Sequence, residues 1–394
     1  MSADAATLGR LRERLAAQPA LAEALWDERD ASAFAARLAE ASSALGEPLT
    51  AAAIGAQLAL PPLSPAAPAP PLKSCVDGAP AGWRPAVAWA AGGGYVVDWV
   101  HLGGRRADGG FYYSEVHRAL GRPFNQLFGF RSPLADLAQP RWAQGMSPSG
   151  LVFHMTHCGS TLVSRMLAAG QTRLALGEPQ PLDMTLRLCA AARLDEPTQL
   201  ALVRGVVGAL CAPRAGETQT FLKLDAWHIG LLPLLRRAFP DTPWVFLYRA
   251  PLEVMAALLE TTGLDPGRFP IGALGLGVDA ASLPEVDYLA AALAAICGLA
   301  LAGKAEGGGL LVNYDQLPAA VETRILPHFG VTSSSADAAA MALAARDNAK
   351  APGLRFAPDS AAKRAAATPE AHAAIRGRLE AAYARLEAAR ALQA

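Results

Sequence analysis

The stretch LVFHMTHCGSTLVSRML at residues 151–167 decides the fold of this 394-residue chain. Its first five residues form a short apolar run, which is typical of a buried strand, and a helical pattern begins directly after a turn that contains Gly159. A strand that turns straight into a helix points successive backbone N–H groups and the helix dipole at one place. The stretch therefore predicts a strand–loop–helix unit that binds an anion, although a tight turn that binds nothing fits the same residues.

Short apolar runs and helical stretches alternate through residues 146–394. Such runs stand at 151–155, 220–224, 244–249 and 309–314. Continuous apolar strands that alternate with helices are typical of a parallel sheet covered on both faces. We therefore expect an α/β domain of three layers here, closed by a long helix whose N-cap is Thr368.

The residues before this domain have a different character. Leucines and a phenylalanine recur at mostly three- and four-residue steps up to about residue 60, which predicts helices. A Pro/Ala-rich stretch follows, and then short β-like pieces (AVAWA, GYVVDWV) among many aromatic residues. The sequence thus predicts four parts: a helical appendage at 1–60, a linker at 61–75, an aromatic-rich mixed segment at 76–145, and the α/β domain at 146–394. The aromatic residues of the mixed segment fit a lid or substrate wall as well as a core.

Composition excludes several classes of partner. Lys plus Arg and Asp plus Glu both number 35, whereas broad nucleic-acid or anionic-membrane binding normally needs a basic excess. The five cysteines are scattered without CxxC spacing, so we expect neither a disulfide framework nor a zinc site. The longest apolar runs, such as 289–302, are Ala-rich and short for a membrane span. We expect a cytoplasmic protein, and the sequence predicts no particular oligomeric state.

The loop HCGSTLVSRML at 157–167 resembles the 5′-phosphosulfate loop of the sulfotransferases, a family with a P-loop fold. The family pattern is a basic residue, a small residue and Gly-[ST]-[ST] opening a helix. An ATP-binding P-loop is disfavoured because no lysine follows Gly159. The family has Lys or Arg where this chain has His157. The resemblance implies that 3′-phosphoadenosine 5′-phosphosulfate is bound here by His157, Cys158, Gly159, Ser160, Thr161 and Leu162.

A second segment, PDTPWVFLYRAPLEVMAALLE at 240–260, resembles the family's 3′-phosphate site. The resemblance implies that Arg249 clamps the 3′-phosphate, a task that suits the guanidinium fork. The family places a serine where this chain has Ala257. Alternatively, Arg249 pairs with an acid such as Glu253. Residues 354–364 lie where the family's basic loop covers the nucleotide, which implies cofactor contacts by Lys363 and Arg364, although a solvated turn fits as well.

The segment TFLKLDAWHI at 220–229 resembles the strand that carries the family's catalytic base. Matching residue by residue puts Asp225 at the base position, with His228 as the other candidate and the N-cap of a helix as a structural alternative for Asp225. Lys223 either reaches the transferring group or pairs with an acid. Glu178 follows the second strand of the family pattern, where it could face the acceptor. His154, inside an apolar strand, is expected to be a core residue.

These resemblances imply a sulfotransferase that moves a sulfuryl group from 3′-phosphoadenosine 5′-phosphosulfate to a hydroxyl or amine of a small-molecule or peptide acceptor, without a metal. Aromatic residues Phe111, Tyr112 and Tyr113 are expected to contact the acceptor. One alternative is a nucleotide-dependent kinase or phosphotransferase, which should carry a loop lysine and an Asp that holds Mg²⁺. The other is a non-catalytic nucleotide-binding protein, which the departures at 157 and 257 would fit.

Overall fold

The computed structural model describes residues 5–59, 71–91, 94–191, 194–260, 282–348, 351–355 and 359–393. The chain divides into two compact units. The first comprises residues 1–106, 113–145 and 205–215, and the second comprises 107–112, 146–204 and 216–394. Most of the linker predicted at 61–75 lies outside the described residues, and the finer division into four parts stays a prediction.

The described part of the first unit begins with the helices α1–α4, and a three-stranded antiparallel sheet in the order β1-β2-β3 follows them in the chain. Asp30 and Thr50 begin two of the helices, because their side chains accept hydrogen bonds from N–H groups three residues later. The elements are α1 (Ala5–Ala16), α2 (Pro19–Asp27), α3 (Ala31–Ala44), α4 (Ala51–Leu58), β1 (Trp83–Ala91), β2 (Gly94–His101), α5 (Tyr112–Leu120), α6 (Pro123–Phe128), β3 (Phe130–Pro133), the 3₁₀-helix η1 (Leu134–Ala138) and α7 (Pro140–Ala143).

Aromatic side chains form much of the core of this unit. Trp99 and Phe130 stack with ring centroids 5.7 Å apart, and Trp83 packs on Phe130 at 5.0 Å. The Trp99 indole N–H donates to the hydroxyl of Ser132 at 3.0 Å, so its polar group is satisfied although it is buried. Many aromatic residues of the segment 76–145 are therefore core residues of the first unit.

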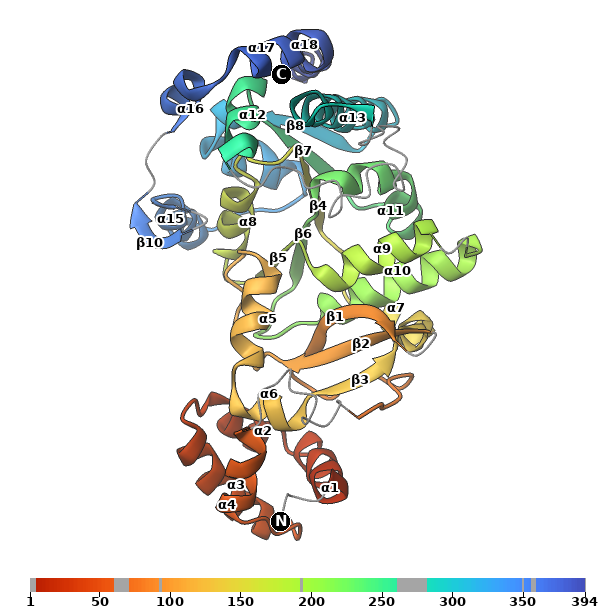
Figure 1. Ribbon diagram of the computed structural model, residues 1–394, viewed down its shortest axis with the longest axis vertical. Coiled ribbons are helices and arrows are strands. Elements are labelled where there is room, and N and C mark those ends of the chain that lie inside the picture. Colours follow the sequence, from red (N-terminus) through yellow and green to blue (C-terminus); the bar gives the residue numbers. More distant parts are fainter. Residues whose placement is uncertain are drawn as a thin grey trace. The chain divides into compact units, whose positions relative to one another are not determined.

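The second unit is built on a five-stranded parallel sheet in the order β5-β6-β4-β7-β8. Figure 1 shows α8 on one side of this sheet and α9 and α11 on the other. The predicted α/β fold with a parallel sheet flanked by helices is thereby confirmed. The strands are β4 (Gly150–His154), β5 (Arg173–Gly177), β6 (Gln219–Lys223), β7 (Trp244–Tyr248) and β8 (Gly309–Asn313), all but the first residue of β6 buried.

The remaining described elements of the chain cover the sheet or extend from it. They are α8 (Ser160–Ala168), α9 (Gln180–Ala191), α10 (Glu196–Leu210), η2 (Ala226–Leu231), α11 (Leu232–Ala238), α12 (Pro251–Glu260), α13 (Glu285–Ala305), η4 (Tyr314–Gln316), η5 (Val321–Ile325), α14 (Leu326–His328), α15 (Ser335–Ala344), β9 (Asp347–Asn348), β10 (Ala351–Arg355), α16 (Ser360–Ala366), α17 (Pro369–Ala374), η6 (Ile375–Leu379) and α18 (Glu380–Ala391). The predicted cap is confirmed, since the Thr368 hydroxyl accepts from the Ala371 N–H at 3.2 Å.

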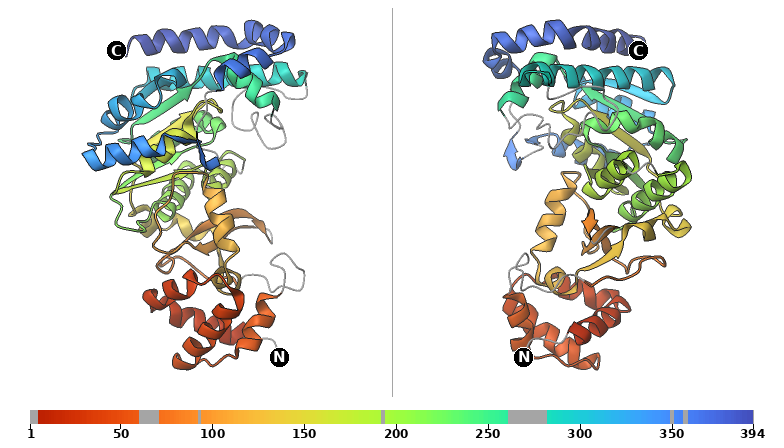
Figure 2. Two further views of the ribbon diagram at one scale, coloured as in Figure 1. Left: turned by 90° about the vertical axis from the view of Figure 1, so that its left-hand side faces the viewer. Right: turned by 45° about the vertical axis from the view of Figure 1, so that its right-hand side comes forward.

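Helix α13 is longer than the apolar run at 289–302, which by sequence alone is short for a membrane span. By length and composition alone, its 21 residues could cross a membrane. In the structure it packs against η2, α17 and α18, and Figure 2 shows α18 running beside it. Half of the most apolar 18-residue stretch of this helix is buried inside the protein, as expected for a core helix of an α/β domain.

Candidate active site

The carboxyl ends of the central parallel strands meet at one pocket of about 370 Å³. Strand β4 leads into the predicted anion loop, β6 ends at Lys223, and β7 is followed by Arg249. This edge is where open α/β sheets place their ligands. Of the residues predicted from the sequence, those that line the pocket are Phe111, His157, Cys158, Gly159, Ser160, Thr161, Leu162, Glu178, Lys223, Arg249 and Lys363.

Other predicted site residues have different surroundings. Tyr112 is buried and Tyr113 is exposed, and neither lines this pocket. Asp225, His228 and Arg364 do not line it either. The pocket instead includes residues that the sequence did not assign to the site, namely His154, Thr156, Tyr314, Asp347, Asn348 and Asp359.

The loop between β4 and α8 adopts an unusual backbone conformation. Thr156 and His157 have φ angles of +75° and +46°, which side-chain-bearing residues rarely adopt. Gly159 has φ of +85°, and a Cβ there would lie 2.7 Å from Leu317 and 3.0 Å from Tyr314. Strain of this kind persists only where the surroundings enforce it, and it clusters at ligand sites. The loop thus brings the N-terminus of α8 to the pocket, where the helix dipole and the N–H groups of the first turn favour an anion.

The thiol of Cys158 is held inside the protein. It is buried and donates a hydrogen bond to the carbonyl of Leu247 at 3.2 Å. Burial raises the pKa of this thiol to about 12, so it stays protonated at neutral pH. Cys158 therefore contributes its backbone to the loop rather than a nucleophile.

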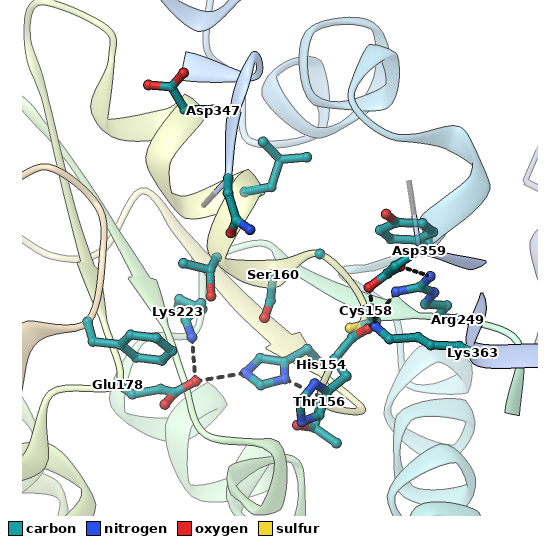
Figure 3. Close-up of a pocket in the computed structure, with 17 residues that line it drawn as sticks. His154, Thr156, Cys158, Ser160, Glu178, Lys223, Arg249, Asp347, Asp359 and Lys363 are labelled. Atoms are coloured by element: carbon teal, nitrogen blue, oxygen red, sulfur yellow. Dashed lines mark hydrogen bonds and ion pairs between the residues drawn. The ribbon is translucent and has the colours of Figure 1, made fainter. Parts of the chain in front are cut away.

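One end of the pocket holds a compact charged cluster made by Glu178, Lys223 and His154 (Figure 3). The Lys223 ammonium pairs with the Glu178 carboxylate and lies 4.6 Å from the centroid of the Phe111 ring. His154 Nε2 lies 3.4 Å from Glu178 Oε1. Glu178 itself has φ of +50°, so it is a third strained residue at this pocket. The sequence left two alternatives for Lys223, and the pairing with an acid is present.

One hydrogen bond and the surrounding charges indicate the protonation states of this cluster. The Thr156 N–H donates to His154 Nδ1 at 3.0 Å, so the neutral ring carries its proton on Nε2. Burial lowers the pKa of His154, which keeps the imidazole neutral. Burial alone would raise the pKa of Glu178, but Lys223 and His154 outweigh it and hold that pKa at about 2. Glu178 is therefore an ionised carboxylate that faces the pocket.

Asp225 and His228 belong to a second cluster beside this one, together with Asp183. The ligand atoms of the three residues lie within 4.8 Å of one another. Asp183 Oδ1 accepts from the Trp227 indole at 3.0 Å and lies 2.9 Å from His228 Nε2. The Asp225 N–H donates to His228 Nδ1 at 3.1 Å. These atoms already bond to one another, and the expectation that no metal takes part stays a prediction.

Asp225 is also in an unfavourable environment for a carboxylate. Burial raises its pKa, and the nearby negative charges of Glu178 and Asp183 raise it further, well above the ordinary value. Asp225 precedes the 3₁₀-helix η2 at its N-cap position, which is the structural alternative that the sequence offered. These surroundings favour the neutral form of the Asp225 side chain, which makes it a poor candidate for the base.

The opposite end of the pocket is organised around the buried guanidinium of Arg249 (Figure 3). Its Nε donates to Glu253 Oε2 at 2.6 Å, as the four-residue spacing suggested. Its Nη2 donates to Asp359 Oδ1 at 2.9 Å and to the Ser360 hydroxyl at 2.8 Å. The group also lies 3.9 Å from the centroid of the Tyr314 ring. Arg249 is therefore held by two carboxylates in this structure.

The two basic residues of the predicted C-terminal loop have separate partners. Lys363 Nζ lies 2.5 Å from Asp359 Oδ2, and its side chain is largely buried. Arg364 pairs with Glu253 at 3.0 Å, but its side chain is 62% exposed. Lys363 thus belongs to the pocket wall, whereas Arg364 lies on the outer side of the Arg249 cluster.

Of three comparisons with known proteins, only the comparison of structures found matches. No family model matches the sequence, and no curated protein does. The chain is similar in structure to bacterial sulfotransferases. One match is STF9 from Mycobacterium avium, with a TM-score of 0.36 and 14% identity over 57% of this chain and 76% of that one. A second is STF1 from Mycobacterium tuberculosis H37Rv, with a TM-score of 0.38 and 17% identity over 56% of this chain and 77% of that one. A third is the sulfotransferase domain of the Synechococcus PCC 7002 olefin synthase, with a TM-score of 0.35 and 16% identity over 57% of this chain and 88% of that one. Scores this low assign no function by themselves.

Proposed function

We propose that this chain is a cytoplasmic sulfotransferase that uses 3′-phosphoadenosine 5′-phosphosulfate and an acceptor with a hydroxyl or amine group. The observation that carries the proposal is the strained loop at 156–159, which brings the N-terminus of α8 to a pocket that also contains Lys223. A phosphosulfate needs backbone N–H donors and a nearby cation, and this end of the pocket supplies both.

The reaction would form a bond from the acceptor oxygen or nitrogen to sulfur and break the bond from sulfur to the phosphate oxygen. The loop amides and the hydroxyls of Ser160 and Thr161 would stabilise the charge that develops on the leaving phosphate. His157, at the position of the family's basic residue, would donate a hydrogen bond to the phosphate oxygen whose bond to sulfur breaks. Lys223 would offset charge on the transferring group.

The acceptor's proton needs a base, and we place that role on Glu178 rather than on Asp225 or His228. Glu178 is ionised and lines the pocket. The surroundings of Asp225 raise its pKa and favour its neutral form, and both nitrogens of His228 already face hydrogen-bonding partners. A carboxylate with so low a pKa is a weak base, but it can orient the acceptor hydroxyl and take its proton as the bond to sulfur forms.

A buried polar atom supports a ligand at this end. His154 Nε2 is buried, and its contact with Glu178 Oε1 at 3.4 Å does not have the geometry of a hydrogen bond. Buried donors that are poorly satisfied are uncommon in folded proteins, and one that lines a pocket can be satisfied by a bound ligand. An acceptor or sulfuryl oxygen near Glu178 would accept a hydrogen bond from this nitrogen. The acceptor is proposed to be a small molecule or peptide.

The other two functions remain as outcomes of the same binding experiment. A kinase would prefer ATP with Mg²⁺, and a non-catalytic protein of this fold would bind nucleotide without transferring a group. The pairing of Arg249 with Glu253 and Asp359 favours the non-catalytic alternative more than any other observation, because it occupies the guanidinium expected to clamp the 3′-phosphate.

The test is calorimetric binding of 3′-phosphoadenosine 5′-phosphate, AMP and ATP–Mg²⁺ to the full chain. The proposal expects the bisphosphate to bind at least about tenfold more tightly than AMP, since a second charge-assisted phosphate site is used. Arg249→Lys, which keeps the charge but not the fork, should lose most of that preference. Equal affinity for the bisphosphate and AMP, or a preference for ATP–Mg²⁺, would refute the assignment. Labelled donor then identifies the acceptor.

A further inference from the structure

Asp359 occupies an unusual position at the Arg249 end of the pocket. One of its carboxylate oxygens accepts from Arg249 at 2.9 Å, and the other lies 2.5 Å from the Lys363 ammonium. It thus bridges two cations that are themselves largely buried, with side chains 4% and 13% exposed. The Asp359 side chain is 45% exposed, so the anion is the accessible member of this group.

The local structure does not explain why an aspartate stands there. Asp359 precedes α16 at the N-cap position, where aspartate usually accepts a hydrogen bond from the first turn of the helix. Its side chain makes no such bond and extends toward Arg249 and Lys363 instead. The carboxylate therefore serves the cations of the pocket rather than the helix.

The geometry resembles that of a bound anion. Two oxygens of one group meet two cations, the Ser360 hydroxyl lies beside them, and the Tyr314 ring covers the guanidinium. Phosphate oxygens prefer the same partners. Because Arg249 also donates to Glu253 and to the His157 carbonyl, most of its N–H donors are taken while Asp359 stays in place.

We infer that Asp359 is a specificity-determining residue. Its carboxylate occupies the anion site at Arg249 and Lys363 and is displaced there by a terminal phosphomonoester. A phosphomonoester carries a charge near −2 at neutral pH, whereas a carboxylate or a phosphodiester carries −1. Only the doubly charged group gains Coulomb energy by replacing Asp359 between the same two cations. The site thereby rejects singly charged anions. This inference rests on the proposed function only where it takes a nucleotide as the ligand, because the anion site itself can be tested with inorganic phosphate.

The experiment measures binding of inorganic phosphate, acetate and 3′-phosphoadenosine 5′-phosphate to four forms of the full chain. These forms are the wild type, Asp359→Asn, Asp359→Glu and Asp347→Asn. Asp347 is a matched control, because it is an exposed carboxylate that lines the same pocket on β9. Thermal unfolding of each form verifies that it is folded.

Asp359→Asn should bind phosphate about fivefold more tightly than the wild type, as expected for removing a partly exposed charge pair that competes with the ligand. The ratio of its affinity for phosphate to its affinity for acetate should be smaller than in the wild type. Asp359→Glu should behave as the wild type, and Asp347→Asn should change affinity less than about twofold, since it alters only the general field. Unchanged or weaker phosphate binding in Asp359→Asn would overturn the inference, and so would an equal gain in Asp347→Asn.

The two proposals fail separately. If Asp359→Asn gains phosphate affinity but no form prefers the bisphosphate over AMP, the inference stands and the sulfotransferase assignment fails. If the wild type prefers the bisphosphate and Asp359→Asn gains nothing, the assignment stands and Asp359 is only a structural neutraliser of Arg249.

Discussion

The two ends of the pocket hold their charges in different ways. At the Lys223 end, charged and polar side chains come from the ends of three adjacent strands of the sheet, β4, β5 and β6. At the Arg249 end, a guanidinium fixed on the sheet meets Asp359, which is 110 residues away and more exposed. The first arrangement is a rigid part of the sheet edge. The second joins a fixed cation to an anion that a ligand can replace.

The sharpest way to break this comparison is to remove Lys223. Lys223→Met should lower the free energy of unfolding by about 2–4 kcal/mol, because it leaves Glu178 ionised without its cation. Urea unfolding measures the loss. The double variant Lys223→Met/Glu178→Gln should recover a large part of it, since neither charge then remains. Strictly additive losses would mean that the pair is not a coupled unit.

Acid titration sharpens the same point. The pKa of Glu178 is depressed to about 2, so its stabilising contribution is complete above its unfolded-state value of about 4.3 and is lost as the pH falls toward 2. The stability difference between the wild type and Glu178→Gln should therefore be constant at neutral pH and shrink below about pH 4. Urea midpoints at each pH measure this difference. A difference that persists undiminished at the lowest folded pH would contradict the ion pair.

The loop between the two ends can be tested with a pair of glycines. Gly159→Ala and Gly330→Ala both place a side chain at positive φ, but only Gly159 is crowded, whereas the space at Gly330 is open. Both should lose about 1 kcal/mol from backbone strain, and Gly159→Ala should lose up to about 2 kcal/mol more from crowding. Only Gly159→Ala should weaken binding of AMP. Equal effects on binding would show that the loop does not form the anion site.

The smallest effect is expected at the outer edge of the Arg249 end. Arg364 pairs with Glu253 but is mostly exposed, so Arg364→Ala should change stability by less than about 0.5 kcal/mol. Bisphosphate affinity should likewise change little, and calorimetry against the wild type measures it. A large loss of affinity would move the nucleotide site outward and assign Arg364 the cofactor role that its position in the sequence suggested.

Most of the sheet could be predicted because its strands are buried on both faces and appear as apolar runs. β5 is the exception among the five strands, because the resemblance placed a strand before Glu178 but no apolar run did. Its sequence, RLALG, is short and begins with Arg173, which is buried by pairing with the Ser333 hydroxyl at 2.9 Å and with Asp337. An arginine in a short run conceals the strand, because its partners lie about 160 residues further along the chain.

The site was predictable where its residues are neighbours in sequence. The loop at 157–162 and the Arg249–Glu253 pair follow from local spacing. Asp359 and Tyr314 could not be found in this way, because only the fold brings them to Arg249. His154 does carry a local signal for the pocket: it is the last residue of a buried strand directly before the predicted anion loop, which is where parallel sheets place functional side chains.

The buried thiol of Cys158 has a practical consequence for experiments on loop motion. The described cysteines of this chain are all buried and unpaired, so alkylating reagents reach them only when the protein opens. Cys158 lies in the loop itself, whereas Cys297 lies on α13 in the core. Labelling of Cys158 at a faster rate than Cys297 would report opening of the loop alone, and its slowing by an added anion would measure occupancy without any engineered probe.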